Sequence, residues 1–168
     1  TAALANPNYV QTHPAESYKI NVEVSVHIAE LCAAAQIPCA FTSTDLVFNG
    51  TSAPYCETDA VAPVMLYGEQ KVLAEEQMLR AYPAIAICRM PLMFGEAGPA
   101  ASSFMQPMLK TLKSGGTLSL FEDEFRTPLS GRDAASALWF ALEKVSGIIH
   151  FGGDERLSRQ RPAHRPHP

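Results

Sequence analysis

Tyr67 and Lys71 are the two residues of this sequence whose types and spacing best suit proton transfer. They stand four positions apart in YGEQKVLAEEQML, which predicts a helix, so both side chains project from one face. An ammonium group beside a phenol is expected to lower the tyrosine pKa, which lets the hydroxyl give a proton to a carbonyl oxygen or take one from an alcohol. The same spacing also occurs in exposed helix pairs that do no chemistry, so the spacing alone leaves both interpretations open.

Further polar residues follow a predicted strand. Ser43, Thr44 and Asp45 stand at and just after the end of IPCAFTST (37–44), an apolar and β-branched run typical of a buried parallel strand. Ligands collect at the carboxyl ends of such strands, and either hydroxyl can donate to a substrate carbonyl oxygen that becomes negative during reaction. Upstream, Asn21 lies in an otherwise apolar helical segment, where it is either a buried amide with partners or a solvent-facing residue.

Helical and strand patterns alternate along the chain. Apolar residues recur at helical spacing between residues 14 and 35, namely Ile20, Val24, Ile28, Leu31 and Ala35, which predicts an amphipathic helix with these residues on its buried face. The later expected elements are a loop over 45–62, helices over about 63–80, 102–113 and 131–144, and strands over 84–90, 117–121 and 147–151. This alternation predicts an α/β chain with a mostly parallel sheet.

The overall composition excludes several classes of protein. With 168 residues, 47% hydrophobic, 18% charged and a net charge of −4, the chain is neither a small disulfide scaffold nor a basic nucleic-acid binder. No segment has the length and composition of a membrane span or signal peptide, so we expect a cytoplasmic protein without membrane or nucleic-acid partners. The histidines are too scattered for a metal site. We expect buried free thiols at Cys32, Cys39, Cys56 and Cys88.

Four motifs stand in order along the chain: STDLVFNG (43–50), Y-x-E-x-D (55–59), P-x-x-x-YGEQK (63–71) and ICRMPLMFG (87–95). In these motifs the chain resembles the extended short-chain dehydrogenase/reductase family, and within it the dTDP-4-dehydrorhamnose reductase-like branch, from residue 1 to about 158. The resemblance implies a partial Rossmann fold, NADPH or NADH as cofactor, and a nucleotide-linked keto sugar as substrate. It also implies Thr44, Tyr67 and Lys71 as the catalytic triad, with Asn21 in support and Lys71 on the nicotinamide ribose.

Two arginines and an aspartate are further candidates because of their positions in the sequence. Arg89 ends a buried strand and Arg126 lies in the loop FEDEFRTP, so each is a candidate bidentate partner for phosphate, although Arg89 fits a structural ion pair equally well. Asp133 is expected to stabilise a helix N-terminus. We expect Ser43, Tyr67, Lys71 and Arg89 at the cofactor, and Thr44, Asp45, Arg89 and Arg126 at the substrate.

Two features depart from the family pattern. The Gly-rich phosphate loop, G-x-x-G-x-x-G, does not occur, since the first glycine is Gly50. By the family's layout we expect the first three or four strands to be missing, which exposes a sheet edge and predicts a poorly soluble or oligomeric chain. Leu92 stands where tryptophan is common in the rhamnose-pathway reductases, so the exact sugar stays open.

The expected organisation has three parts: the C-terminal half of a Rossmann domain with the catalytic residues over 1–95, a substrate-binding region interleaved with the last Rossmann elements over 96–158, and a disordered tail over 159–168. The first functional hypothesis is a reductase acting on a nucleotide sugar, with a homo-oligomer as one expected state. The alternatives are a non-catalytic dinucleotide-binding subunit resembling the regulatory subunit of methionine adenosyltransferase, and an inactive truncated product.

Overall fold

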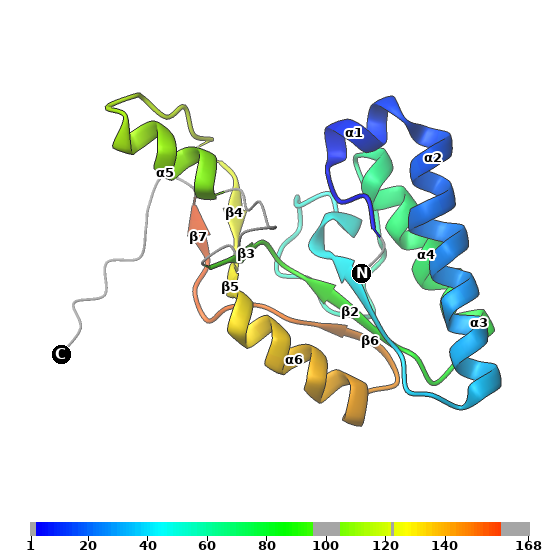
Figure 1. Cartoon of the computed structure of the whole chain (residues 1–168). Helices are drawn as coiled ribbons and strands as arrows, with labels where there is room; N and C mark the ends of the chain where they lie inside the picture. The colour runs from blue at the N-terminus through cyan, green and yellow to red at the C-terminus, as the bar shows by residue number, and fades with distance from the viewer. Residues whose placement is uncertain (1–2, 96–104, 122, 159–168) are drawn as a thin grey trace. The chain divides into compact units, whose positions relative to one another are not determined.

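The computed structural model describes residues 3–95, 105–121 and 123–158, and the chain divides into two compact units (Figure 1). Unit 1 is Thr1–Met90 with Ala137–His150, and unit 2 is Pro91–Ser136 with Phe151–Pro168. The expected disordered tail over 159–168 lies outside the described residues. Most of the candidate site residues belong to unit 1, namely Asn21, Ser43, Thr44, Asp45, Tyr67, Lys71 and Arg89.

Unit 1 is built on a parallel sheet of three strands, in the order β1 (Ala40–Thr44), β2 (Ala86–Met90) and β6 (Gly147–His150). All five residues of the central strand β2 are buried, as its continuous apolar sequence predicts for a strand covered on both faces. The expected α/β fold with a mostly parallel sheet is confirmed.

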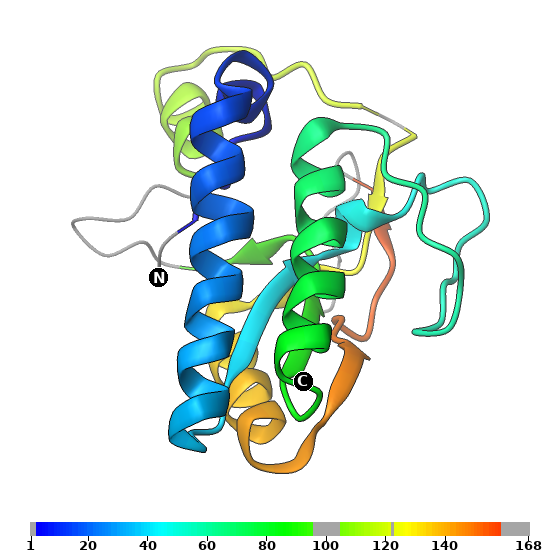
Figure 2. The ribbon, with the colours of Figure 1, turned by 90° about the vertical axis from the view of Figure 1, so that its right-hand side faces the viewer.

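Helices lie on both faces of this sheet (Figure 2). One face is covered by α3 (Ser25–Ala35) and α4 (Leu66–Ala81), and the other by the part of α6 (Gly131–Lys144) that belongs to unit 1. The core between α3, α4 and the sheet contains Ala29, Phe41, Ala74, Met78, Ile85 and Ile87. This packing holds α4 against β1, which positions the candidate site.

The helix expected over 14–35 forms as three successive pieces: α2 (Pro14–Tyr18), the π-helical segment η1 (Lys19–Val24) and α3. A shorter helix, α1 (Pro7–Thr12), precedes them, and the Asn6 side chain caps it by accepting from the amides of Asn8 and Tyr9. Wide π-helical turns inside helices are frequent at functional sites. Asn21 lies within η1.

Our prediction of which face of this helical stretch is buried is wrong. Ile28 and Leu31 are exposed, at 43% and 57% of their surface. Four of the five buried residues are instead small or polar and are spaced four apart, namely Ser17, Asn21, Ser25 and Ala29, and the fifth is Val22. One reason is that Gln70 of α4 supplies hydrogen-bond partners to Ser17 and Asn21, which apolar side chains could not use.

Unit 2 contains short elements. Two pairs of strands form, β3 (Met93–Phe94) parallel to β5 (Leu129–Ser130), and β4 (Phe125–Arg126) antiparallel to β7 (Leu157–Ser158); its helices are α5 (Met105–Lys113) and the first turns of α6. The strand expected over 117–121 does not form, because the segments of unit 2 that pair do so with one another and leave it without a partner. Arg126, expected in a loop, belongs to β4.

The start of α6 shows a reciprocal cap. The Ser130 hydroxyl donates to the Asp133 carboxylate at 2.7 Å and accepts from the Asp133 amide at 3.0 Å. The expectation that Asp133 stabilises a helix N-terminus is confirmed.

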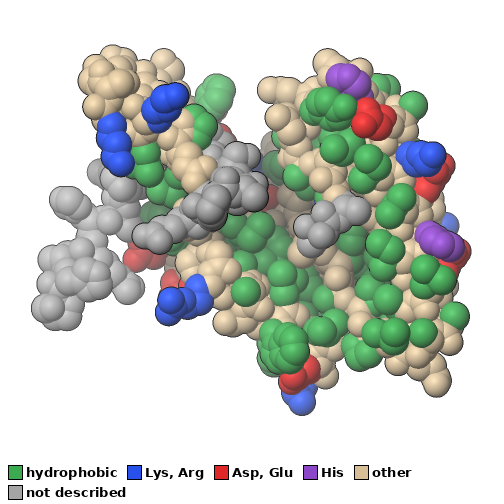
Figure 3. All heavy atoms as spheres, viewed as in Figure 1, with side chains coloured by type: hydrophobic (Ala, Val, Ile, Leu, Met, Phe, Trp, Pro, Cys, Tyr) green, Lys and Arg blue, Asp and Glu red, His purple; other side chains and the backbone are tan. Residues whose placement is uncertain are grey.

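Apolar side chains also reach the surface of unit 1, where they lie among charged ones (Figure 3). No helix in the described ranges is long and apolar enough to cross a membrane.

Candidate active site

Three buried side chains follow one face of α4 at four-residue spacing: Tyr67, Lys71 and Glu75. Helix α4 lies against β1, and the Lys71 ammonium donates to the Thr42 carbonyl oxygen of that strand at 2.7 Å. The same nitrogen lies 4.1 Å from the centre of the Phe41 ring and 6.0 Å from that of Tyr67. The pair is therefore buried against the sheet, and the interpretation as an exposed helix pair is wrong.

Gly68 allows this close approach. A Cβ atom at position 68 would lie 2.9 Å from Pro63 Cβ and still closer to the carbonyl oxygen of Leu46. Leu46 belongs to η2 (Asp45–Val47), the 3₁₀ turn that follows β1. The glycine thus brings the first turn of α4, which carries Tyr67, against the turn that begins after Thr44.

Thr44 ends β1 and caps η2. Its hydroxyl oxygen accepts from the Leu46 amide at 3.2 Å and lies 3.3 Å from an Asp45 carboxylate oxygen, to which it donates. Its side chain is buried and held at the carboxyl end of the strand, as the sequence predicted. The hydroxyl proton is engaged only by this long bond, so it can turn toward a substrate oxygen without a large loss.

The electrostatics of Tyr67 differ from the expectation. Burial, and next the negative charge of Asp45, raise the pKa of the Tyr67 phenol to about 12. Burial lowers the pKa of Lys71 to about 8, while the Glu75 carboxylate opposes that shift. The expected lowering of the tyrosine pKa is therefore wrong for the chain by itself, because the lysine ammonium is directed to the Thr42 carbonyl oxygen and burial dominates.

Asn21 is buried and fully engaged. Its amide group accepts from the Leu4 amide at 2.9 Å and donates to the Leu4 carbonyl oxygen at 3.1 Å and to the Gln70 side chain at 3.0 Å. Gln70 in turn donates to the Ser17 hydroxyl at 2.9 Å. Of the two readings left open, the buried amide is confirmed, and the network ties the N-terminal segment to α4 one residue before Lys71.

Ser43 and Arg89 meet at a buried carboxylate. The Ser43 hydroxyl donates to Glu75, and the Arg89 guanidinium binds the same carboxylate through Nε and Nη2, the latter at 2.7 Å. Arg89 Nη1 lies 3.3 Å from Nε2 of His150. The structural ion pair foreseen for Arg89 is thus present, whereas binding of cofactor by Ser43, or of cofactor or substrate by Arg89, stays a prediction.

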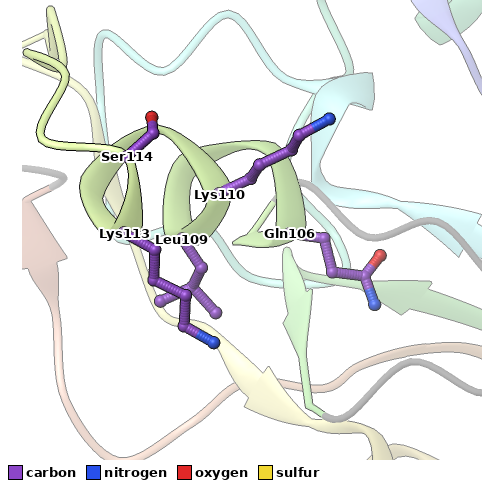
Figure 4. A pocket seen from close by; sticks show the side chains of 5 residues that line it. All are labelled: Gln106, Leu109, Lys110, Lys113 and Ser114. Carbon is purple, nitrogen blue, oxygen red and sulfur yellow. The ribbon is translucent and has the colours of Figure 1, made fainter.

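Arg126 belongs to unit 2, where its Nε donates to Glu124 at 3.1 Å; binding of substrate by Arg126 also stays a prediction. Unit 2 also has an open hollow of about 450 Å³, lined by four residues of α5 and by the serine that follows it (Figure 4): Gln106, Leu109, Lys110, Lys113 and Ser114. None of them is a predicted site residue. In the described part of the chain, no three His, Cys, Asp or Glu residues gather in a way that could hold a metal ion.

The cysteines are free, as expected, but the prediction that all four are buried is partly wrong. Cys88 is buried in β2, whereas Cys56 is exposed in the loop before α4. The Cys56 backbone amide donates to the Asp59 carboxylate at 2.6 Å. A short loop held by its own side chains leaves the thiol at the surface.

Sequence reasoning missed Glu75 and Gln70, and it took His150 as a structural residue without foreseeing its partners. Glu75 carried a usable signal, since it stands four residues after Lys71 on a predicted buried face, where an acidic residue needs a partner. Gln70 carried a similar signal, because a buried amide at Asn21 needs hydrogen-bond partners and Gln70 can supply one. His150 had no such signal, because its partners lie about 60 to 95 residues away in the chain.

The residues of unit 1 fit part of a nicotinamide dinucleotide. Among the described residues the Tyr67 hydroxyl makes no hydrogen bond, and Lys71 uses one of its N–H donors, on Thr42. These two side chains can hold ribose hydroxyls. The sequence holds no Gly-rich loop for a pyrophosphate.

Two relatives match most of the chain in sequence. Over 94% of its length the chain is 30% identical to dTDP-4-dehydrorhamnose reductase of Aggregatibacter actinomycetemcomitans, of which it covers 55%. Over 96% of its length it is 28% identical to methionine adenosyltransferase 2 subunit beta of Pongo abelii, of which it covers 51%. The chain thus spans about half the length of these relatives.

Solved structures show the same fold. A hypothetical dTDP-4-dehydrorhamnose reductase from Sulfolobus tokodaii superposes with a TM-score of 0.83 at 34% identity, over 95% of this chain and 55% of that one. The Bacillus anthracis dTDP-4-dehydrorhamnose reductase, in complex with NADP, gives a TM-score of 0.86 at 21% identity, over 94% and 56%, which supports the fold alone.

The sequence match to a family covers nearly the whole chain. Residues 1–165 match the RmlD substrate binding domain, so the match continues past residue 158, where the resemblance was expected to end. The expected kinship with the reductase-like branch is confirmed. This chain belongs to the RmlD substrate binding domain family, within the extended short-chain dehydrogenases/reductases.

Proposed function

We propose that this protein reduces a nucleotide-linked keto sugar with NADPH or NADH, as a dTDP-4-dehydrorhamnose reductase does. The observation that carries the proposal is the Tyr67 phenol, which is buried, lacks a hydrogen-bond partner among the described residues, and shares one face of α4 with Lys71. The family, and relatives that bear the reductase name, support it.

Each residue has a distinct task in the proposed reaction. The reduced nicotinamide supplies the hydride when it is bound. Tyr67 gives its proton to the carbonyl oxygen, and a pKa of about 12 keeps the phenol protonated at neutral pH, as reduction requires. Thr44 donates a hydrogen bond to the same oxygen as negative charge develops there. Lys71 holds the ribose hydroxyls with the N–H groups that Thr42 leaves available.

The other assignments belong to the same proposal. Asn21 supports the site by tying η1 to α4 through Gln70. Asp45 contacts the sugar and Arg126 its phosphates. Residues 1–95 carry the catalytic groups, and 96–158 bind the sugar nucleotide.

The test compares Tyr67→Phe with Tyr82→Phe. Both changes remove only a hydroxyl from α4 or its C-terminal cap, and the Tyr82 hydroxyl bonds the Ile37 carbonyl oxygen at 3.2 Å. With dTDP-4-dehydrorhamnose and NADPH or NADH, we expect Tyr67→Phe to lower kcat by about 100- to 10,000-fold, the usual contribution of a general acid. Tyr82→Phe should keep wild-type turnover. Equal turnover in Tyr67→Phe and wild type would refute the proposal.

A second candidate is a non-catalytic regulatory subunit. It is favoured by the 28% identity to methionine adenosyltransferase 2 subunit beta over 96% of the chain. That role predicts binding to a methionine adenosyltransferase catalytic subunit that Tyr67→Phe leaves unchanged, with no keto-sugar reduction by the wild type. Pull-down with that subunit separates the two roles, and sedimentation tests the expected homo-oligomer.

A further inference from the structure

Glu75 is a buried carboxylate outside the proposed chemistry. It lies one helical turn after Lys71 on α4, and its side chain is 3% exposed. Three donors converge on it: the Ser43 hydroxyl, Arg89 Nε at 3.1 and 3.2 Å, and Arg89 Nη2 at 2.7 Å. A buried charge is tolerated only with such a full set of partners. The charge of Glu75 is thus balanced by Arg89, whose side chain is 5% exposed.

The partners of Glu75 form a row across the sheet. Ser43 of β1 stands beside Arg89 of β2 in the strand register, and Arg89 stands beside His150 of β6. Because Arg89 Nη1 can only donate, Nε2 of His150 accepts, and its Nδ1–H then donates to the Tyr55 carbonyl oxygen at 3.3 Å. One carboxylate on α4 therefore holds a row that spans all three strands.

Two consecutive turns of α4 are fastened to two consecutive residues of β1. Lys71 bonds the Thr42 carbonyl oxygen, and Glu75 bonds the Ser43 hydroxyl. A single contact would allow the helix to slide or turn about it, whereas two contacts a turn apart, about 5.4 Å along the axis, set both its position and its rotation. Tyr67 lies one turn before Lys71 on the same face.

We infer that Glu75 is a positioning residue: held by Arg89 and Ser43, it fixes α4 on β1 so that Tyr67 and Lys71 take their places beside Thr44. The inference rests on the proposed function, which gives Tyr67 and Lys71 their tasks. Glu75 also acts on Lys71 through charge, since it raises the pKa that burial lowers.

Few other charges face Lys71. Tyr67 lies on its own helix and Asp45 faces Tyr67 from η2. Arg89 of β2 faces Glu75, and His150 of β6 faces Arg89. The charged residues of η1 and α3, which also pack against α4, are exposed: Lys19, Glu23, His27 and Glu30. The Lys71 titration therefore reports mainly on Glu75.

The test titrates Lys71 by NMR in the full chain labelled with ¹³C-lysine, with Lys71→Arg to assign the resonance. Glu75→Gln keeps the length and acceptor oxygen but removes the charge, and we expect the Lys71 pKa to fall below the wild-type value of about 8. Glu75→Asp keeps the charge but is too short to reach both Ser43 and Arg89, so it should shift the Tyr67 ring resonances. The control is Glu76→Gln, a neighbouring exposed glutamate paired with Arg80, and it should change neither.

The outcomes separate this inference from the proposed function. A wild-type Lys71 titration in Glu75→Gln, or unshifted Tyr67 resonances in Glu75→Asp, would overturn it. If Glu75→Gln fails to fold because Arg89 is left unpaired, Glu75→Gln with Arg89→Met removes both charges, and the Lys71 pKa must still fall. Neither readout needs substrate. A wild type that reduces no keto sugar would thus refute the function alone.

Activity gives a further readout if the wild type is a reductase. In Glu75→Asp we expect kcat to fall on the order of 100-fold, as a misplacement near 1 Å produces, while KM for the sugar nucleotide changes little. Unchanged kcat in a variant with shifted Tyr67 resonances would also overturn the positioning role.

Discussion

Replacing Gly68 by alanine tests whether the close approach of α4 to η2 positions the site. The new Cβ would lie 2.9 Å from Pro63 Cβ and closer still to the Leu46 carbonyl oxygen, whereas ordinary contacts begin at 3.4 Å. The first turn of α4 must therefore move from η2 by more than about 0.5 Å, and shifts of this order cost on the order of 10- to 100-fold in rate. Overpacking of this kind destabilises a fold by about 1–3 kcal/mol, only partly offset by the better helix propensity of alanine.

The assay for Gly68→Ala combines thermal unfolding with turnover. Each kcal/mol should lower Tm by about 2–4 °C in a chain of this size. The matched control is Gly131→Ala at the start of α6, where the new Cβ would have its nearest neighbour, the Phe94 carbonyl oxygen, at an ordinary 3.7 Å. We expect Gly131→Ala to keep wild-type stability. Wild-type Tm and turnover in Gly68→Ala would show that the backbone contact does not position Tyr67.

Three further predictions concern stability. Met78→Ala opens a cavity in the core beside α4 and should cost about 2–5 kcal/mol in urea unfolding, and a loss under 1 kcal/mol would contradict the packing. Ser130→Ala removes the cap on Asp133 and should cost about 0.5–2 kcal/mol, with faster amide exchange confined to the first turn of α6. Burial raises the pKa of Cys88 from 9.0 to about 11, so the unfolded chain ionises first and stability falls between pH 9 and 11. Urea unfolding of Cys88→Ala should show a shallower fall over that range, and an equal fall would contradict the assignment.

The alternation of elements could be predicted because it depends on local signals. The strand at β2 follows from a continuous apolar run, and α6 begins where Ser130 and Asp133 provide a cap. The strand predicted over 117–121 does not form, and the reason cannot be found in the local sequence. An apolar run such as TLSLF becomes a strand only where a partner edge is available, and here the paired segments of unit 2 pair with one another.

The buried face of the helical stretch over residues 14–35 was predicted wrongly for a related reason. Periodicity predicted burial of Ile28 and Leu31, yet Asn21 and Ser25 are buried instead. Hydrophobic spacing shows that one side of a helix differs from the other, but the side that is covered depends on which element packs there. Gln70, far away in the chain, decides it by bonding Asn21.

The sequence by itself determined the α/β class, the placement of Tyr67 and Lys71 on one helix face, and the polar end of β1, because each depends on residues a few positions apart. Only the tertiary structure decided the charges and partners at the site. Burial raised the tyrosine pKa instead of lowering it, and Arg89 became the partner of Glu75. Desolvation and ion pairing depend on which groups the folded chain brings together, and spacing along the sequence does not specify that.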